Sequence, residues 1–275
     1  MSDRPGRRAT AELLRRHGVR PRRSLGQHFL IDPNIVSKIV RLTETGLGDR
    51  VLEVGTGTGN LTRALAEAAL RVRSYEVDER LRPLLAEVLA GFPNVDLRFQ
   101  DALQADLPAT LGEGAWTMAA NLPYHVGTPL LLILLREAPQ LERFVVMLQR
   151  ETAERLVASP GTKTYGIPSV IARLYAEVDI TFRVPPQVFL PPPPVESAVV
   201  VLQRLGGPPH GAGRAVELAM AAFGKRRKML RRSLGGILEE PARTLAAAGI
   251  DPTARAEQLS PDDYLRLAAA VDDAR

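Results

Sequence analysis

The chain has 275 residues, of which 45% are apolar and 24% are charged, close to the averages of globular proteins. This length allows one large domain with a small companion, and the composition argues against a chain that is disordered throughout. The formal net charge is +5 and there is no cysteine, so disulfides, thiolate metal sites and cysteine nucleophiles are excluded.

The histidines and the apolar runs narrow the possibilities further. The four histidines lack the short paired spacing of zinc sites, so we expect no metal. No run approaches the roughly eighteen apolar residues of a membrane-spanning helix, and the arginine-rich N-terminus is not followed by a hydrophobic stretch. The expected location is therefore the cytoplasm, with no membrane partner.

Residues 1–24 predict a basic N-terminal arm. The first 23 residues hold eight arginines and few apolar side chains, interrupted by proline and glycine, with one helix expected over residues 10–17. Such a segment either binds phosphate groups or forms a disordered tail, and the sequence leaves both interpretations open.

Residues 25–205 alternate between helical and strand patterns. The expected helices cover residues 34–45, 60–69, 79–90, 129–137, 151–158 and 167–176. The expected strands cover residues 50–54, 71–77, 95–99, 116–120, 144–149, 179–184 and 198–203. This alternation predicts an α/β fold, a Rossmann-like sheet of seven mostly parallel strands with helices on both faces, in which the last strand is antiparallel.

Residues 206–275 predict a small all-α domain. The boundary is indicated by residues 205–213, which hold four glycines and two prolines. Helices are expected over residues 214–235 and 241–248. A last helix should begin after Ser260, an N-cap residue followed by a first-turn proline and by Asp263.

The segment VLEVGTGTGNLT places Gly55, Gly57 and Gly59 between a β-branched strand and a helix. Glycine is needed where the backbone turns sharply and a ligand approaches closely, yet this loop alone suits a dinucleotide, S-adenosylmethionine or a plain tight turn. Glu76 ends the next strand, twenty-one residues after Gly55, where an acid accepts hydrogen bonds from ribose hydroxyls. Asp101 ends the third strand, near the expected adenine. The alternative is that Glu76 and Asp101 have no ligand and are simply solvated side chains or helix-capping groups.

The choice of cofactor follows from the spacing. The loop reads GTGTG rather than G-x-G-x-x-G, and Glu53 just before it suits a positive amino group better than a pyrophosphate. The sequence therefore favours S-adenosylmethionine over a dinucleotide.

The segment NLPY follows the fourth strand and has the chemistry to bind an exocyclic amine. The nitrogen of adenine shares its lone pair with the ring, so its two N–H groups must be held to restore nucleophilicity. The side-chain oxygen of Asn121 and a backbone carbonyl near Leu122 can accept these bonds, while Pro123 fixes the turn and Tyr124 offers a stacking face. The alternative is an ordinary Asn-x-Pro turn.

From residue 24 to residue 267, the chain resembles the bacterial 16S rRNA adenine N6,N6-dimethyltransferases, the KsgA/RsmA family. The resemblance rests on the ordered segments SLGQHFLID, LEVGTGTGNLT, YEVD, QDAL, NLPY, VFLPPPPVES and AFGKRRKMLR. It implies that residues 25–205 form an S-adenosylmethionine-dependent methyltransferase domain. The implied activity is dimethylation of two adjacent adenosines near the 3′ end of 16S rRNA, within the immature small ribosomal subunit and as part of ribosome biogenesis.

The resemblance also assigns residues. Its implied cofactor contacts are Gln27, His28, Leu30, Gly55, Gly57, Glu76, Asp101 and Asn121. The family often has asparagine where this chain has His28; an imidazole can still form a hydrogen bond, and a core or capping histidine is the alternative. Phe189 matches the aromatic residue that faces Tyr124 across the target base, although the residues alone favour a phenylalanine in the core.

A basic segment near the C-terminus predicts an RNA contact. Six positive charges lie within eight residues of one expected helix: Lys225, Arg226, Arg227, Lys228, Arg231 and Arg232. Such a cluster usually forms a solvated face, but repulsion between like charges one turn apart costs helix stability and favours a phosphate partner.

Two other functions remain open from the sequence. A 23S rRNA dimethylase of the macrolide-resistance type would share the first domain, although the long proline-rich loop (VFLPPPPVES) and the form of the C-terminal segment argue against it. Alternatively, the chain acts chiefly as an assembly factor that binds the immature small subunit. In each case we expect a monomer.

Overall fold

The computed structural model describes residues 6–123 and 126–273. The chain divides into two compact units. The sheet unit comprises Met1–Ala153 and Asp179–Gln203, and the helical unit comprises Glu154–Val178 and Arg204–Arg275. The predicted boundary at residue 205 lies close to one of these divisions, but residues 154–178 group with the C-terminal helices. The division into folding domains stays a prediction.

The seven-stranded sheet is confirmed, and each expected strand is present to within three residues at either end. The strand order is β4-β3-β2-β5-β6-β9-β7. In the same order the strands are Val95–Phe99, Arg71–Glu76, Arg50–Val54, Trp116–Asn121, Leu141–Gln149, Ser197–Arg204 and Ala176–Val184. Neighbours from β4 to β6 are parallel, and β9 is antiparallel to β6 as expected, although β7 takes the edge beyond it.

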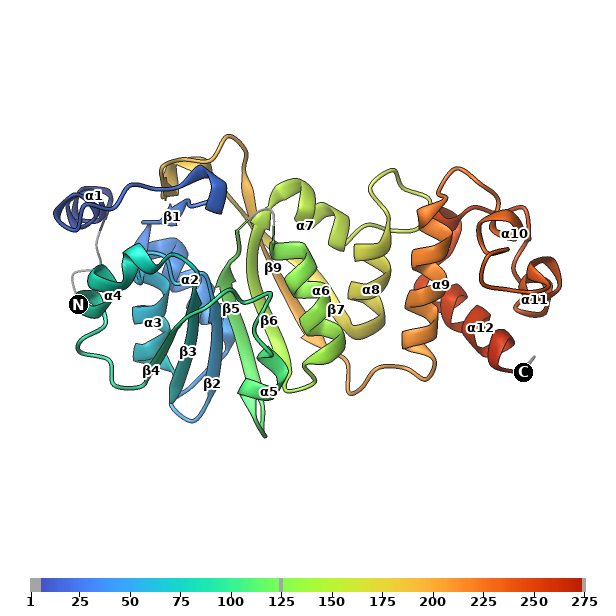
Figure 1. Cartoon of the computed structure of the whole chain (residues 1–275), viewed down its shortest axis with the longest axis horizontal. Helices are drawn as coiled ribbons and strands as arrows, with labels where there is room; N and C mark the ends of the chain where they lie inside the picture. The colour runs from blue at the N-terminus through green and yellow to red at the C-terminus, as the bar shows by residue number, and fades with distance from the viewer. Residues whose placement is uncertain (1–5, 124–125, 274–275) are drawn as a thin grey trace. The chain divides into compact units, whose positions relative to one another are not determined.

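Helices cover both faces of this sheet (Figure 1). On one face, α2 (Pro33–Thr43) and α3 (Asn60–Ala68) share an apolar core with alternate residues of the strands, including Val145 and Met147. Leu148 points the other way and meets α6 (Gly127–Glu137), since a Cβ added at Gly127 would lie 3.0 Å from its side chain. Burial on both faces explains why the central strands are largely apolar.

The N-terminal arm is folded where the structure describes it. Helix α1 (Arg7–Arg16) starts three residues before the expected helix, and its Leu13 and Leu14 pack in a cluster with Leu84 and Leu85 of α4 (Arg82–Val88). Arg16 and His17 both bond Glu87 of α4. Because apolar contacts and ion pairs anchor this helix, the disordered-tail interpretation does not hold for residues 7–16.

Short elements connect these parts. The helical turns are η1 (Arg23–Leu25), η2 (Glu79–Leu81), α5 (Leu107–Leu111), α7 (Arg150–Leu156) and η3 (Pro186–Val188). A separate two-stranded ladder pairs β1 (Phe29–Leu30) with β8 (Phe189–Leu190), which ties the N-terminal segment to the proline-rich loop. Neither α5 nor this ladder is predicted by the sequence pattern. None of the described helices is long and apolar enough to cross a membrane.

The helical unit corrects one expectation. Its helices are α8 (Ile167–Tyr175), α9 (Ala212–Gly224), α10 (Leu230–Ser233), α11 (Pro241–Ala247) and α12 (Pro261–Asp272), with a short turn η4 (Ala256–Gln258). Helix α12 begins at the predicted Ser260 cap, whose side chain accepts a bond from the amide of Asp263 at 3.1 Å. The single helix expected over residues 214–235 is wrong, because α9 ends at Gly224 and Met229 pairs with Arg255.

Candidate functional site

A cavity opens at the carboxyl ends of strands β2, β3, β4 and β5, and all of its lining belongs to the sheet unit. The cavity has a volume of about 980 Å³ when the space at its open mouth is included. The expected cofactor residues all line it, together with part of the NLPY segment: Gln27, His28, Leu30, Gly55, Gly57, Glu76, Asp101, Asn121, Leu122 and Pro123. The structure thus brings together residues up to 96 positions apart in the sequence.

The glycine loop after β2 forms the floor of this cavity. Gly55 and Gly57 have φ values of 87° and 58°, which side chains rarely adopt. A Cβ at Gly55 would lie 3.3 Å from the carbonyl oxygen of Asn121, and one at Gly57 would lie 3.1 Å from the ring of Phe29. Glycine therefore lets the loop turn and lets the ends of β2 and β5 approach each other.

Glu76 is held to this loop by backbone amides. One carboxylate oxygen accepts the N–H of Gly57 at 2.8 Å, and the other accepts the N–H groups of Val77 and Asp78, each at 2.9 Å. Burial raises the pKa of Glu76 above its usual range, although the three amide bonds act in the opposite direction. The carboxylate is thus fixed at the cavity wall by donors of its own backbone.

Asp78 is a further polar anchor at this edge, which sequence reasoning missed. Its carboxylate accepts a bond from Gln27 Nε2 at 2.8 Å and is held by Arg80. Burial raises the pKa of Asp78, but the bonds from Arg80 and Gln27 outweigh it and leave the pKa below the usual range. Gln27 in turn accepts the amide of Arg22 at 2.8 Å, which fixes the segment that leads into β1. The sequence signal that could have identified Asp78 is its place as the fourth residue of the segment YEVD, two positions after Glu76.

The wall beyond Glu76 combines an acid with two exposed apolar side chains. Asp101 accepts the amide of Leu103 at 2.9 Å. Val77 and Leu103 line the same cavity and remain 49% and 41% exposed. Large apolar side chains left open inside a cavity suit the faces of a flat aromatic ring, a feature that the sequence analysis did not identify.

Asn121 closes the cavity at the end of β5. Its Nδ2 donates to the carbonyl oxygen of His28 at 3.1 Å, while its Oδ1 has no partner among the residues that the structure describes. Leu122 is buried, and the carbonyl of Pro123 accepts the amide of Gly127, the first residue of α6, at 2.9 Å. Tyr124 lies outside the described residues.

Pro191 and Phe189 of the proline-rich loop both contact the segment that holds His28 and Leu30. The imidazole Nδ1 of His28 lies 2.8 Å from the carbonyl oxygen of Pro191, so a backbone contact fixes this ring at the cavity wall. Phe189 pairs with Leu30 in the β1–β8 ladder and is 1% exposed in the apolar core. Phe189 does not line the cavity. The expected contact between Phe189 and the target base therefore stays a prediction.

Glu53 does not face the cavity, contrary to the expectation from its place before the glycines. Its side chain is fully buried beneath the loop and accepts bonds from Thr62 at 2.6 Å and Ser74 at 2.5 Å. Burial raises the pKa of Glu53 to about 8. Its other oxygen, Oε1, has no hydrogen-bond partner within residues 6–123 and 126–273. The strand alternation turns Glu53 into the interior, where it braces α3 and β3 instead of meeting a ligand.

The basic segment lies in the helical unit and is not one helix. Lys225, Arg226, Arg227 and Lys228 form the turn after α9, and Arg231 and Arg232 lie on α10. All six are exposed. Arg226 donates to the carbonyl of Lys163 at 3.1 Å and lies 3.7 Å from Glu257, so part of its role is to hold this turn. The amide of Leu230 donates to the carbonyl of Ala254, which pulls the chain out of helical geometry.

Comparison with known proteins decides the family. The model of the family described as ribosomal RNA adenine dimethylase matches residues 18–273, nearly the whole chain. The chain belongs to the ribosomal RNA adenine dimethylase family. Members of this family are methyltransferase enzymes, so the resemblance noted in the sequence is confirmed at the level of family and enzyme class.

Relatives within the dimethylase family are similar over almost their full length. Three that carry the name ribosomal RNA small subunit methyltransferase A come from Phenylobacterium zucineum, Rhodospirillum rubrum and Geobacillus kaustophilus. Their identities are 46%, 46% and 40%. The alignments cover 94%, 96% and 97% of this chain and 91%, 92% and 96% of the relatives.

Two solved structures share the fold of this dimethylase. A dimethyladenosine transferase from Plasmodium falciparum has a TM-score of 0.73 and 26% identity, with 87% of this chain and 96% of the other covered. The 23S rRNA methyltransferase ErmE has a TM-score of 0.67 and 28% identity, with 89% and 99% covered. The Rossmann-like methyltransferase sheet is therefore common to all three chains.

Proposed function

We propose that the chain uses S-adenosylmethionine to dimethylate the N6 atoms of two adjacent adenosines near the 3′ end of 16S rRNA, within the immature small ribosomal subunit. The observation that carries this proposal is the meeting of Glu76, the glycine loop and the amide of Asn121 in one cavity. A cofactor site and an acceptor for an amine thus share one space. The proposed substrate places the reaction in the cytoplasm.

The residues present fit this cofactor. Glu76 offers acceptor lone pairs for ribose hydroxyls, and Val77 and Leu103 offer apolar contacts for the adenine, with Asp101 beside them. The glycine loop leaves room where a Cβ would obstruct the cavity floor. When bound, S-adenosylmethionine supplies an electrophilic methyl group on a positively charged sulfur.

Asn121 prepares the target nitrogen. Because its Nδ2 is engaged by the carbonyl of His28, its Oδ1 is the atom oriented to accept an N–H of the exocyclic amine. A backbone carbonyl at Leu122 would accept the second N–H. Held in this way, the nitrogen lone pair is withdrawn from the ring and directed along one axis. No general base is required, since the nitrogen becomes strongly acidic as it is alkylated.

Stacking would fix the base that Asn121 binds. Tyr124 follows Pro123 in the sequence, and Phe189 lies in β8, which pairs with β1. For Phe189 to meet a base, its ring must leave the core, so this contact depends on binding of the RNA. Stacking of one base on an aromatic ring is worth roughly 1 to 3 kcal/mol.

The basic segment supplies the contact with rRNA. Lys225, Arg227 and Lys228 are exposed on a turn rather than along a helix, so their side chains can reach phosphate groups of an irregular RNA surface. Phosphate contacts position a substrate without reading its sequence. This surface therefore contributes affinity, while the cavity selects the base.

A second candidate is methylation of 23S rRNA, favoured by the likeness to ErmE at 28% identity. Relatives named for the small subunit reach 46% identity over more than nine-tenths of the chain, which supports the small-subunit substrate. Methyl transfer to undermethylated small subunits and to large subunits, followed by nucleoside mass spectrometry, distinguishes the two. Dimethyladenosine in 16S rRNA supports the proposal, and its appearance only in 23S rRNA overturns it.

A separate role in subunit assembly is tested by Glu76→Ala. If the variant loses methyl transfer yet binds immature small subunits and alters their maturation, binding is independent of catalysis. If binding is lost as well, the two roles cannot be separated. Glu76→Gln is the matched control, since it keeps the size of the side chain and an acceptor oxygen.

A further inference from the structure

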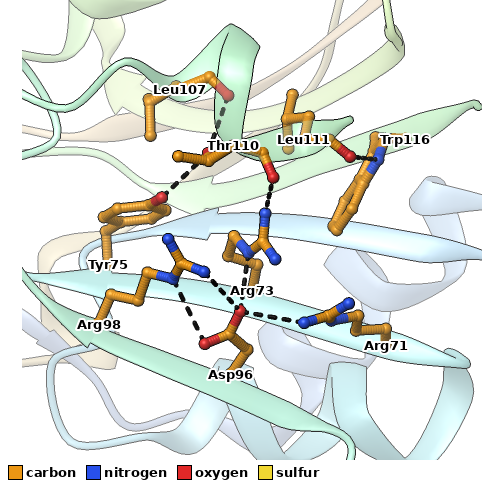
Figure 2. A network of polar contacts seen from close by, with 9 residues as sticks. All are labelled: Arg71, Arg73, Tyr75, Asp96, Arg98, Leu107, Thr110, Leu111 and Trp116. Atoms are coloured by element: carbon orange, nitrogen blue, oxygen red, sulfur yellow. Dashed lines mark hydrogen bonds and ion pairs between the residues drawn. The ribbon is translucent and has the colours of Figure 1, made fainter. Parts of the chain in front are cut away.

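One face of strands β2, β3 and β4 carries four arginines outside the cavity. We call Arg50, Arg71, Arg73 and Arg98 the sheet-face arginine cluster. The parallel register pairs Arg50 with Arg71, Arg73 with Asp96 and Tyr75 with Arg98, which puts all of these side chains on the same face. Figure 2 shows Arg71 and Arg98 on either side of Asp96, with Arg73 between Asp96 and Thr110.

The cluster holds more positive charge than its acid can neutralise. Asp96 accepts bonds from Arg73 at 2.9 Å, Arg71 at 3.2 Å and Arg98 at 3.3 Å. Burial raises the pKa of Asp96, but the bonds from Arg98 and Arg73 outweigh it and hold the pKa below its usual range. Asp96 is thus ionised at neutral pH. One carboxylate serves three guanidinium groups.

Arg50 extends the cluster towards β5. It donates to the carbonyl of Glu113 at 2.6 Å and lies over the ring of Trp116, with its guanidinium carbon 5.9 Å from the ring centre. Arg73 lies over the same ring at 5.5 Å. These contacts order the guanidinium groups without cancelling their charge, so the cluster keeps a surplus of positive charge.

The arginines of the cluster differ in solvent exposure. A buried arginine can anchor the cluster, and the exposed arginines can contact a ligand. The side chain of Arg73 is 7% exposed and is tied to Thr110, whereas those of Arg71 and Arg98 are 50% and 37% exposed. A face of a parallel sheet is normally buried under helices. Here α5 has only five residues, so solvent reaches the arginines beside it.

We propose that the sheet-face arginine cluster binds phosphate groups of the rRNA substrate, away from the base that is modified. This inference rests on the proposed RNA substrate. Guanidinium groups bind phosphate through paired, charge-assisted hydrogen bonds, and ordering them beforehand lowers the entropy cost of that contact. Repulsion between the arginines is relieved when a polyanion binds.

Arg71 of the sheet-face arginine cluster lies at the opposite end of β3 from the cavity. Arg71 begins β3 and Glu76 ends it, which is roughly 16 Å along the strand. A nucleotide whose base enters the cavity cannot also place its phosphate on Arg71. The cluster therefore engages other nucleotides of a large, folded RNA, and its contribution is to affinity and not to the rate of the bound complex.

The test is the double substitution Arg71→Gln with Arg98→Gln, which spares the buried Arg73. The matched control is Arg136→Gln with Arg243→Gln, which removes two exposed arginines elsewhere. Binding to undermethylated small subunits is measured over a series of KCl concentrations, and thermal unfolding checks the fold. We expect affinity to fall roughly tenfold and the slope of log K against log salt to decrease by between one and two.

The rate of methyl transfer at saturating subunits should stay within about twofold of the unsubstituted chain. Arg71→Lys with Arg98→Lys, which keeps the charge, should restore the salt slope. Equal affinity and slope for the Gln double variant and its control would overturn the inference even if dimethyladenosine is formed. Weaker binding by the double variant supports the cluster even if no transfer is seen, in which case only the proposed function fails.

Discussion

The two ends of strand β3 carry opposite polar chemistry. At its carboxyl end, Glu76 is held by three backbone amides and lines the cavity. At its start, Arg71 shares Asp96 with two other arginines and is half exposed. A group fixed by its own backbone and shielded from water suits a small ligand that needs exact placement, whereas a charge surplus on an open face suits a large polyanion. In our proposals, the same strand thus separates cofactor binding at one end from RNA binding at the other.

The largest expected effect comes from Glu76→Ala, which breaks the carboxyl end alone. Removing the charged acceptor of two hydrogen bonds donated by ribose hydroxyls should weaken S-adenosylmethionine binding by about a thousandfold. Calorimetry measures this loss, and affinity for small subunits should be unchanged. Intact cofactor binding together with weakened rRNA binding would reverse the assignment of the two ends.

Asn121→Ala should lower the rate of methyl transfer by about a hundredfold, because the target amine loses its acceptor. Cofactor affinity should fall much less, because Glu76, Val77 and Leu103 still line the cavity. Asn121→Asp keeps an acceptor oxygen and should retain more of the rate, as measured with saturating subunits. Equal rates for the Ala and Asp variants would argue against an acceptor at this position.

A smaller effect is expected from the triple variant Lys225→Gln, Arg227→Gln and Lys228→Gln. It removes exposed charges of the basic segment and leaves Arg226, which holds the turn, in place. Affinity for small subunits should fall about tenfold, and the salt slope should decrease by about two. An unchanged slope, with the fold intact by circular dichroism, would identify this segment as a solvated surface.

The last prediction concerns the pH dependence of stability and not binding or catalysis. The pKa of Glu53 is raised by burial to about 8, from about 4.5 in the unfolded chain, so the folded chain binds this proton more tightly. That contribution is fully present below pH 4.5 and is lost as the pH rises through 8, at up to about 1.4 kcal/mol per pH unit. Glu53→Gln carries no such proton. Its thermal midpoint should therefore rise relative to the unsubstituted chain between pH 6 and pH 9, and a constant difference would contradict the buried acid.

The sheet and the cavity lining followed from the sequence because their signals are local. Strands such as β2 and β4 are short β-branched or alternating runs, and their predicted bounds match the structure. The glycine loop, Glu76 and Asn121 follow these strands directly, and parallel strands end at one edge. Fold and cavity were therefore accessible without long-range information.

The predictions that failed depend mostly on contacts between residues that are far apart in the sequence. The break after Gly224 depends on Met229 pairing with Arg255, which no window around residue 225 can reveal. The grouping of α8 with α9 and α12 likewise depends on contacts between distant helices. Glu53 shows a subtler limit, since its position beside the loop was correct while the direction of its side chain followed the strand alternation.

The central claim is that the amide of Asn121 faces an adenine amine inside the cofactor cavity. The most direct test is a crystal structure of the chain with a bisubstrate analogue in which adenosine N6 is joined to the sulfur position of an S-adenosylmethionine analogue. We predict hydrogen bonds from the adenosine nitrogen to Asn121 Oδ1 and from the cofactor ribose to Glu76. An analogue bound with its adenosine beyond reach of Asn121, or outside this cavity, would contradict the account.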